Sequence, residues 1–338
     1  MVEQNNFFDT TTDVEKNIYL GDIKPGDILI FDGEDHGISL LIKKFTHSQV
    51  THGAIFMQGG SVAALADAGS GGIHMHQVDS RDSSRIVHVR RITKKGGFGE
   101  NFDKTVAPVI DIARDYVNQD LPYPYSDLVL LAMILIYKDV SDVSLKQAAV
   151  IKFLKVVTAE LKKIIDDKFH DGKHTMVCSS FVYQCYLDAS QNNPDLKIDI
   201  KYGDADYDPN YKAKRSATLF DLYAEHATEY NYKTSIFNNE KDEPVTESLD
   251  ELLEDLVNKD NNHVSLVKGN ALSHAIEEFL KALMKACGFV VKDVKDLIEN
   301  ARKQQAMFVT PNDLYCHTTN TGSVGQIRLY RHDEEYTP

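Results

Sequence analysis

Residues 174–183 read HTMVCSSFVY and place a cysteine, Cys178, where a loop gives way to a helix. From residue 177 onward, apolar side chains recur three or four residues apart, which is the period of an amphipathic helix. These side chains are Val177, Phe181, Val182, Cys185 and Tyr186. Residues 171–175, DGKHT, supply turn and capping residue types just before them. We therefore expect a helix that carries the thiol of Cys178 in its first turn.

A thiol in this position suits nucleophilic chemistry. The thiolate is the reactive form of cysteine, and a helix N-terminus or a neighbouring imidazolium stabilises its negative charge. The unpaired N–H groups of the first turn could also serve as an oxyanion hole. The alternative is that Cys178 is only a small buried residue, as most free cysteines are. Cys185, seven residues on along the apolar face, fits that interpretation better.

A hairpin pattern upstream supplies a partner for the thiol. Residues 50–57 and 62–68 favour strands, and Gly59 and Gly60 favour a two-residue turn between them. Counting outward from that turn places His52 directly opposite Asp67, close enough for the carboxylate to contact the imidazole. A slip of one residue would put Asp67 on the other face. Alternatively, His52 is a strand histidine satisfied by backbone and Asp67 a polar loop residue, but their coincidence with a helix-start cysteine favours a site.

Other residues are rivals for these roles. His170 and His174 lie near the cysteine in sequence and compete for the role of base. His76 or Asp79 would replace the orienting carboxylate if the hairpin register differs.

Two patterns suggest a metal and are ranked last. A metal-dependent hydrolase would use His52, His74 and His76, but no Cys or carboxylate at ligand spacing completes that set. The loop 32–36, DGEDH, carries cation-ligating residue types, although such loops are more often only solvated. We expect no cofactor.

The motifs also occur in a recognisable order. The chain contains KPGDIL at residues 24–29, VTHGAI at 50–55, ADA at 66–68 running into GGI at 71–73, and VCSSFV at 177–182. Together they resemble permuted NlpC-type papain-fold cysteine hydrolases, above all the YiiX/YaeF-like subgroup, which is related to the lecithin-retinol acyltransferase group. In that family the histidine strand precedes the cysteine helix, the reverse of the order in papain.

The resemblance implies both roles and a fold. Cys178 would be the nucleophile, His52 the general base and Asp67 the third, orienting residue, although family members more often carry Glu or His at the third position. The implied fold is α+β: a circularly permuted papain-like antiparallel sheet packed on the cysteine helix, with helical insertions.

Two further segments fit the same family. Residues 121–126, LPYPYS, resemble its tyrosine-containing stretch before the cysteine, and residues 309–315, VTPNDLY, resemble its closing segment. The resemblance makes Tyr123, Tyr125 and Ser179 candidates for the substrate groove.

The resemblance and the helical periodicity together divide the 338 residues into a catalytic domain and helical additions. We expect a papain-like domain at 18–232 and 306–332, with a helical insertion at about 126–170, and an inserted helical unit at 233–305. Residues 128–136 are apolar all round but span nine residues, against roughly 20 for a transmembrane helix. They predict a buried helix, and no transmembrane segment is expected.

Charge and cysteine content restrict partners and compartment. The net charge of −14 argues against nucleic acid as a partner, because phosphate binding needs clustered Lys and Arg. Four scattered cysteines form no disulfide scaffold and favour a reducing, cytoplasmic compartment. The first residues lack the features of a secretory signal peptide. The acidic stretch 333–336 weakly resembles glutamate-rich signals of bacterial type IV effectors, although such a stretch is more often a frayed, solvated tail. Export without a cleaved signal peptide is a second expectation.

The expected reaction is acyl transfer to a thiol. The Cys178 thiolate attacks the carbonyl of an amide, ester or thioester, His52 takes and returns the proton, and water resolves the acyl-enzyme. The substrate would be a small-molecule, lipid-like or peptide-like acyl compound. One alternative is an acyltransferase. Another is a catalytically silent papain-like module that presents residues 233–305 to a protein partner.

Overall fold

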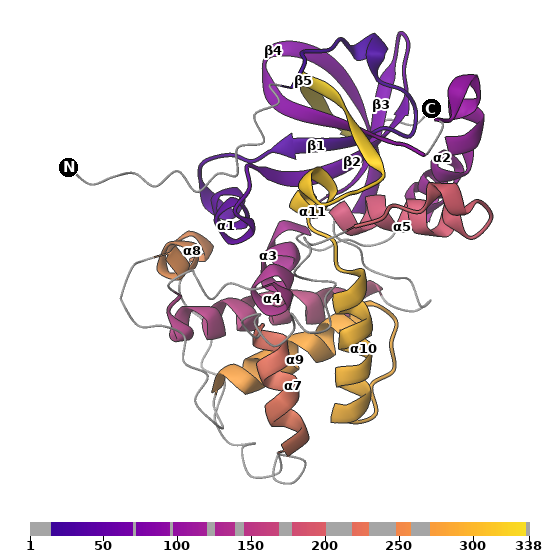
Figure 1. The fold of residues 1–338 in the computed structure, drawn as a ribbon. Helices are drawn as coiled ribbons and strands as arrows, with labels where there is room; N and C mark the ends of the chain where they lie inside the picture. The colour runs from indigo at the N-terminus through magenta and orange to yellow at the C-terminus, as the bar shows by residue number, and fades with distance from the viewer. Residues whose placement is uncertain are drawn as a thin grey trace.

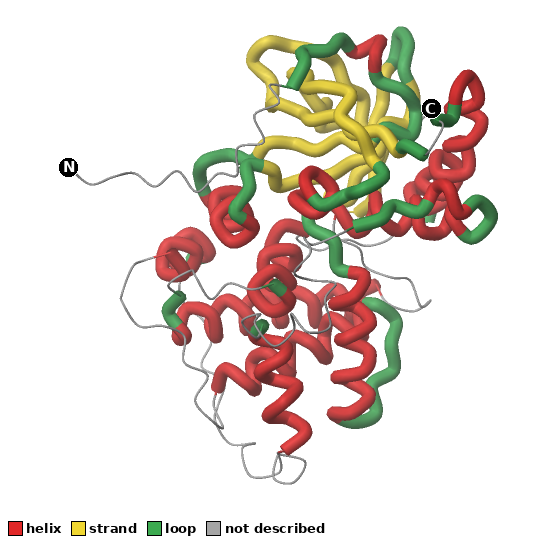
Figure 2. The backbone as a smooth tube through the Cα atoms, in the orientation of Figure 1, coloured by secondary structure: helices red, strands yellow, loops and turns green. Residues whose placement is uncertain are grey.

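Strands and helices separate into two lobes. The computed structural model describes residues 15–69, 72–94, 97–119, 126–138, 145–168, 178–200, 218–229, 248–257 and 271–335. Within them, the strands gather in one lobe and most helices in the other (Figures 1 and 2). The predicted α+β class with an antiparallel sheet is confirmed.

The sheet closes on itself. Its strands are β1 (Ile28–Asp32), β2 (Val50–Gln58), β3 (Ala63–Gly69), β4 (Gly72–Ile92) and β5 (Thr321–Glu335). All pair antiparallel in the order β1-β2-β3-β4-β5. The first part of the long β4 pairs with β3 and a later part pairs with β1, which turns the first four strands into a small barrel.

Alternation along each strand gives the barrel two apolar faces. The inner face is a cluster that includes Leu29, Phe31, Ala54, Phe56, Leu65, Val78, Val87, Val89, Ile327 and Leu329. The outer face packs against α2 (Phe102–Asn118) and α5 (Cys178–Ser190) through a second cluster that includes Ile28, Ile55, Ala66, Val106, Phe181 and Val182. Helix α5 therefore lies against β2 and β3 (Figure 1), and the predicted helix that begins at the cysteine is confirmed.

The helical lobe has one hydrophobic cluster. Its helices are α1 (Gly37–Thr46), α3 (Ser126–Tyr137), α4 (Gln147–Lys168), α7 (Leu219–Glu229), α8 (Leu249–Val257), α9 (Ala271–Ala286) and α10 (Val294–Met307). Helix α3 is buried on all sides, as its composition predicts. Helices from the predicted insertion at 126–170 and from the predicted unit at 233–305 share this core, so the two segments pack as one body.

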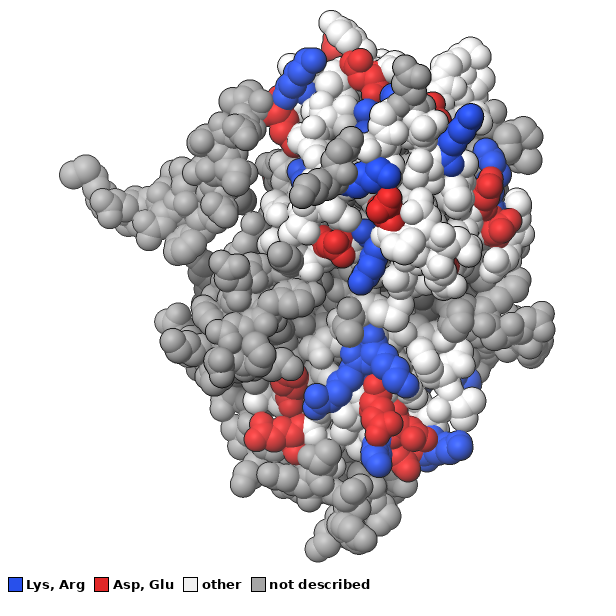
Figure 3. All heavy atoms as spheres, turned by 45° about the vertical axis from the view of Figure 1, so that its right-hand side comes forward, with Lys and Arg blue, Asp and Glu red and all other residues white. Residues whose placement is uncertain are grey.

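The described residues also form four short helical elements. Single turns of 3-10 helix occupy Leu20–Asp22, Gly99–Asn101 and Pro194–Leu196, and α11 (Pro311–Cys316) leads into β5. Among the described helices, none combines the length and apolar character needed to cross a bilayer. On the face drawn in Figure 3, acidic and basic side chains lie interspersed over both lobes.

Candidate active site

His52 lies at one end of the barrel, on its inner face. The residue sits in β2 directly opposite Phe31 of β1, and it follows the alternation that points Ala54 and Phe56 inward. Its ring meets the ring of Phe31 edge-on, with 5.7 Å between centroids. The next residue pair shifts register, so the regular ladder between β1 and β2 stops beside the histidine.

Asp67 meets His52 as the hairpin count predicts, but by a different register. The Nε2 atom of His52 lies 2.8 Å from Oδ2 of Asp67. The residue opposite Asp67, however, is Ala54, and the expected direct pairing with His52 is wrong by two residues. A longer connection at residues 59–62 and a register shift between Phe56 and Gln58 cause the difference. A shift of two keeps a side chain on the same face, so the contact survives.

Cys178 reaches this histidine from the helical side. It is the first residue of α5, its side chain is buried, and it interacts with the imidazole of His52 through charge and hydrogen bonding. The start of the helix packs over Gly53, where a Cβ atom would lie 3.6 Å from the Cα of Ser179, in ordinary van der Waals contact. A small residue beside the histidine therefore suits the close packing of α5 on β2.

The three groups favour a charged imidazole. Burial alone disfavours the imidazolium, but the interactions with Cys178 and Asp67 outweigh it and raise the pKa of His52 to about 10. Burial likewise opposes ionisation of Asp67, yet His52 and Arg331 hold the pKa of that carboxyl well below its ordinary value. At neutral pH a carboxylate therefore faces an imidazolium, which in turn faces the sulfur.

Arg331 is a member of this group that sequence reasoning missed. It lies in β5, and its Nη1 donates to Oδ2 of Asp67 at 2.6 Å. The side chains of Ile327, Leu329 and Arg331 alternate onto the inner face of the barrel. That alternation was the available signal, but the contact spans more than 250 residues and leaves no local pattern.

The rival residues lie elsewhere around Asp67. The Nε2 atom of His76 is 3.5 Å from Oδ1 of Asp67, an oxygen with no hydrogen bond to the described residues. Asp79 instead bonds with Arg81 and His332. His76 therefore borders the carboxylate on the side away from its bond with the base, and Asp79 belongs to a separate surface cluster. His170 and His174 lie outside the described residues.

Of the groove candidates, Ser179 has a structural contact. Its side chain is buried, and its Oγ donates to the carbonyl of Val309 at 2.6 Å, which ties α5 to the segment before α11. It does not line an open surface. Tyr123 and Tyr125 lie outside the described residues. In α11, Thr310 and Asp313 form a capping box, and Asp313 also bonds to Lys138 at 2.8 Å.

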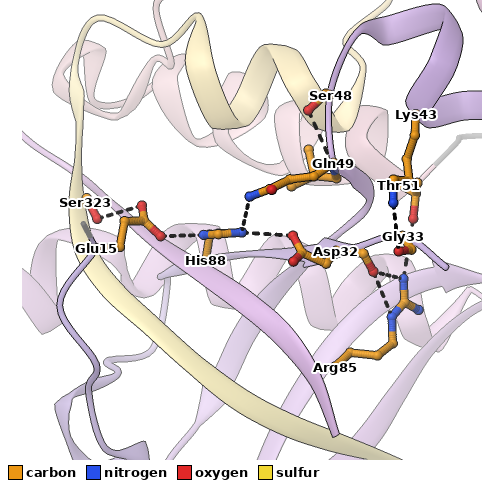
Figure 4. Close-up of polar contacts among 11 residues, drawn as sticks. Glu15, Asp32, Gly33, Lys43, Ser48, Gln49, Thr51, Arg85, His88 and Ser323 are labelled. Carbon is orange, nitrogen blue, oxygen red and sulfur yellow. Dashed lines mark hydrogen bonds and ion pairs between the residues drawn. The ribbon is translucent and has the colours of Figure 1, made fainter. Parts of the chain in front are cut away.

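A second buried polar cluster occupies the barrel flank (Figure 4). His88 lies between two carboxylates: its Nδ1 bonds to Glu15 and its Nε2 to Asp32, the latter at 2.9 Å. Burial disfavours the charged ring, but Asp32 and Glu15 raise the pKa of His88 to about 9. Glu15 also accepts a bond from Ser323 at 3.0 Å. The cluster joins the segment before β1 to the barrel.

The metal patterns do not converge. The rings of His74 and His76 are 6.2 Å apart. In the loop 32–36, Asp32 bonds to His88 and Asp35 to Lys43. Across the described ranges, no three His, Cys, Asp or Glu side chains are grouped closely enough to hold an ion.

Comparison with known proteins adds no relative. No protein-family model matches the chain, and no curated protein matches it significantly.

Proposed function

We propose that this chain is a cysteine hydrolase with a permuted papain-like fold, acting on an amide, ester or thioester. The observation that carries the proposal is the position of His52, whose ring interacts with the Cys178 sulfur and with the Asp67 carboxylate at 2.8 Å. A nucleophile, a base and a group that orients the base are the three parts of a covalent acyl-transfer site. The order of these residues in the chain agrees with the permuted family.

The geometry suggests a division of labour. Because Nε2 of His52 is engaged by Asp67, Nδ1 is the ring nitrogen left to exchange a proton with the thiol. The thiolate forms a bond to the substrate carbonyl carbon, and the N–H groups of the first turn of α5 stabilise the oxyanion. His52 then protonates the leaving group. Water, activated by the same ring, releases the acid and restores the thiol.

A second candidate is a binding module without catalysis. Cys178 has 0 % exposed surface, whereas the side chain of His52 is 14 % exposed. A thiol that no substrate can reach would favour this alternative, with the helical lobe as the surface that meets a protein partner. Acyl transfer to an acceptor other than water is a variant of the first proposal.

Thiol reactivity separates the candidates. We expect Cys178 to react with iodoacetamide at neutral pH at least tenfold faster than Cys185, which lies in the same helix and is equally buried. Site-resolved mass spectrometry measures both rates, in a Cys316→Ser background because Cys316 is exposed. His52→Gln should slow the reaction of Cys178 and leave Cys185 unchanged.

Equal rates at Cys178 and Cys185 in the folded protein would refute the enzyme proposal and favour the binding module. Where Cys178 is reactive, intact-mass detection of an acyl adduct after incubation with a panel of acyl esters and amides identifies the substrate. Cys178→Ala, which cannot form the adduct, is the control.

A further inference from the structure

Two arginines share the inner face and the barrel end with His52. Arg85 of β4 lies directly opposite Leu329, an inward-facing residue of β5, and Arg331 is the next inward-facing residue along β5. The guanidinium of Arg85 lies over the ring of Phe31, 5.7 Å from its centroid, and that ring meets His52 edge-on. Arg331 contacts Asp67, the partner of His52. Phe31 therefore lies between Arg85 and the candidate base, and Asp67 lies between Arg331 and the same base.

Arg85 is held in place by uncharged acceptors. Its Nε and Nη2 donate to the backbone carbonyl of Asp32 at 2.9 and 2.5 Å, and Nη2 also lies 3.4 Å from the hydroxyl of Thr51 (Figure 4). Among the described residues no carboxylate lies within ion-pair distance of it. The group is thus fixed in orientation without an ion pair, and Nη1 has no bond to the described residues.

Both cations and carboxylates act on Arg85, but none of these carboxylates forms an ion pair with it. Partial burial lowers the pKa of Arg85, and the charge of Arg331 lowers it further, which shows that the two guanidinium groups act on each other. Glu34 and Asp127 are the carboxylates that oppose this effect most, but neither forms an ion pair with Arg85. Asp67 is balanced by His52 and Arg331. Arg85 is thus a guanidinium without an ion pair among the described residues, and Phe31 alone separates it from the candidate base.

We propose that Arg85 and Arg331 form an oxyanion-binding subsite beside His52, so that the substrate carries a carboxylate or phosphate near its scissile acyl group. The inference rests on the proposed function and names the substrate class for it. A planar guanidinium with a free N–H edge matches either anion, because both present paired oxygens. Arg85 is the principal contact, since Arg331 already donates to Asp67.

The reagents iodoacetate and iodoacetamide test this charge preference. Both alkylate a thiolate by forming an S–C bond and expelling iodide, but one carries a carboxylate. We expect the iodoacetate-to-iodoacetamide rate ratio at Cys178 to fall about fivefold in Arg85→Gln, as one nearby charge is lost. Arg85→Lys should retain most of the preference. Arg90→Gln is the matched control, because Arg90 also lies in β4 and donates to Thr321, but on the opposite face.

A measurement without the thiol keeps the two proposals apart. Inorganic phosphate or acetate, compared with chloride at equal ionic strength, should raise the melting temperature of the wild type and not that of Arg85→Gln. The anion with the larger effect identifies the group. If Cys178 is unreactive but the stabilisation depends on Arg85, the hydrolase proposal fails and the subsite stands. An unchanged rate ratio, or equal stabilisation of wild type and Arg85→Gln, overturns the subsite.

Discussion

A fully buried carboxylate governs the candidate site at the scale of single residues. Asp67 accepts bonds from both His52 and Arg331 on one oxygen, so its negative charge is compensated twice. Burying a carboxylate without such partners would cost several kcal/mol. Arg331 stabilises the negative charge of Asp67, and that charge in turn favours the imidazolium form of His52. Arg331 of β5 therefore influences the base through Asp67.

Asp67→Asn should therefore weaken both stability and reactivity. The substitution removes the charge that helps keep His52 protonated and leaves Arg331 without its anion. We expect the free energy of unfolding to fall by about 2–4 kcal/mol. We also expect Cys178 to be alkylated at least tenfold more slowly at neutral pH. Denaturant titration and site-resolved labelling measure the two effects. Asp79→Asn, which alters an exposed pair with Arg81, should cost about 1 kcal/mol or less.

Deprotonation of His88 should lower the stability of the protein at alkaline pH. Its pKa in the folded state is raised to about 9 from an ordinary 6.5, so the folded protein binds its proton more tightly than the unfolded chain. The resulting stabilisation is complete below pH 6.5 and is lost as the pH rises through 9. The difference in unfolding free energy between wild type and His88→Gln should shrink by about 2–3 kcal/mol over that range. Glu15→Gln should reduce this slope, and a difference that stays constant with pH would contradict the assignment.

At the scale of elements, the approach of α5 to β2 decides where the sulfur lies. Helix α5 begins at Cys178 and packs over Gly53, the residue after the candidate base. A Cβ atom added to Gly53 would lie 3.7 Å from Leu314 and 3.8 Å from Val182, which are ordinary van der Waals distances. A methyl group fits in that space, whereas a branched side chain does not.

The pair Gly53→Ala and Gly53→Val tests this packing. We expect the alanine variant to keep its stability within about 1 kcal/mol and its thiol reactivity. The valine variant should lose about 1–3 kcal/mol and most of the reactivity, because the added methyl groups push the helix away from His52. Thermal unfolding and alkylation rates provide the measurements. Equal reactivity in the two variants would mean that helix position does not control the thiol.

The hairpin shows what could be predicted about the site. Strand alternation has a period of two, so the count from Gly59 and Gly60 identified the face shared by His52 and Asp67 even though the register was wrong. The turn itself was mistaken because two consecutive glycines do not reveal a four-residue connection. Arg331 was missed because pairing between distant strands leaves no mark within either one.

At the scale of the whole molecule, Cys178 joins the two lobes. Its side chain belongs to the hydrophobic cluster of the helical lobe, whereas Phe181 and Cys185 of the same helix belong to the cluster on the outer face of the barrel. The bond between Lys138, just after α3, and Asp313 of α11 adds a second connection. A change inside one lobe should therefore reach the other.

Phe153→Ala tests whether the lobes unfold together. Phe153 is fully buried in the helical lobe, and its truncation should cost about 3–5 kcal/mol. If unfolding is cooperative, native-state labelling of Cys185 on the barrel side should accelerate in proportion. The experiment uses a Cys178→Ala, Cys316→Ser background, with Lys163→Ala on the surface of α4 as control. Unchanged labelling of Cys185 would show that the lobes open independently.

The sequence predicts individual helices of the fold better than it predicts how those helices pack together. Helical periodicity predicts helical segments at 126–170 and 233–305, where α4, α8 and α9 and most of α10 lie, and the apolar run at 128–136 predicts the buried α3. The division into an insertion at 126–170 and a unit at 233–305 followed chain order. An amphipathic pattern reveals that a helix has an apolar face but not which distant helix will cover it.

Arg331 is synthesised long after the other residues of the candidate site. A ribosome that has just made Cys178 has 153 more residues to add before Arg331, which takes roughly 8–30 s at typical rates of synthesis. During that interval the nascent polypeptide carries Cys178, His52 and Asp67, but not the guanidinium that pairs with the Asp67 carboxylate. The ion pair that balances the buried Asp67 carboxylate therefore forms only after β5 has been made and has paired with β4.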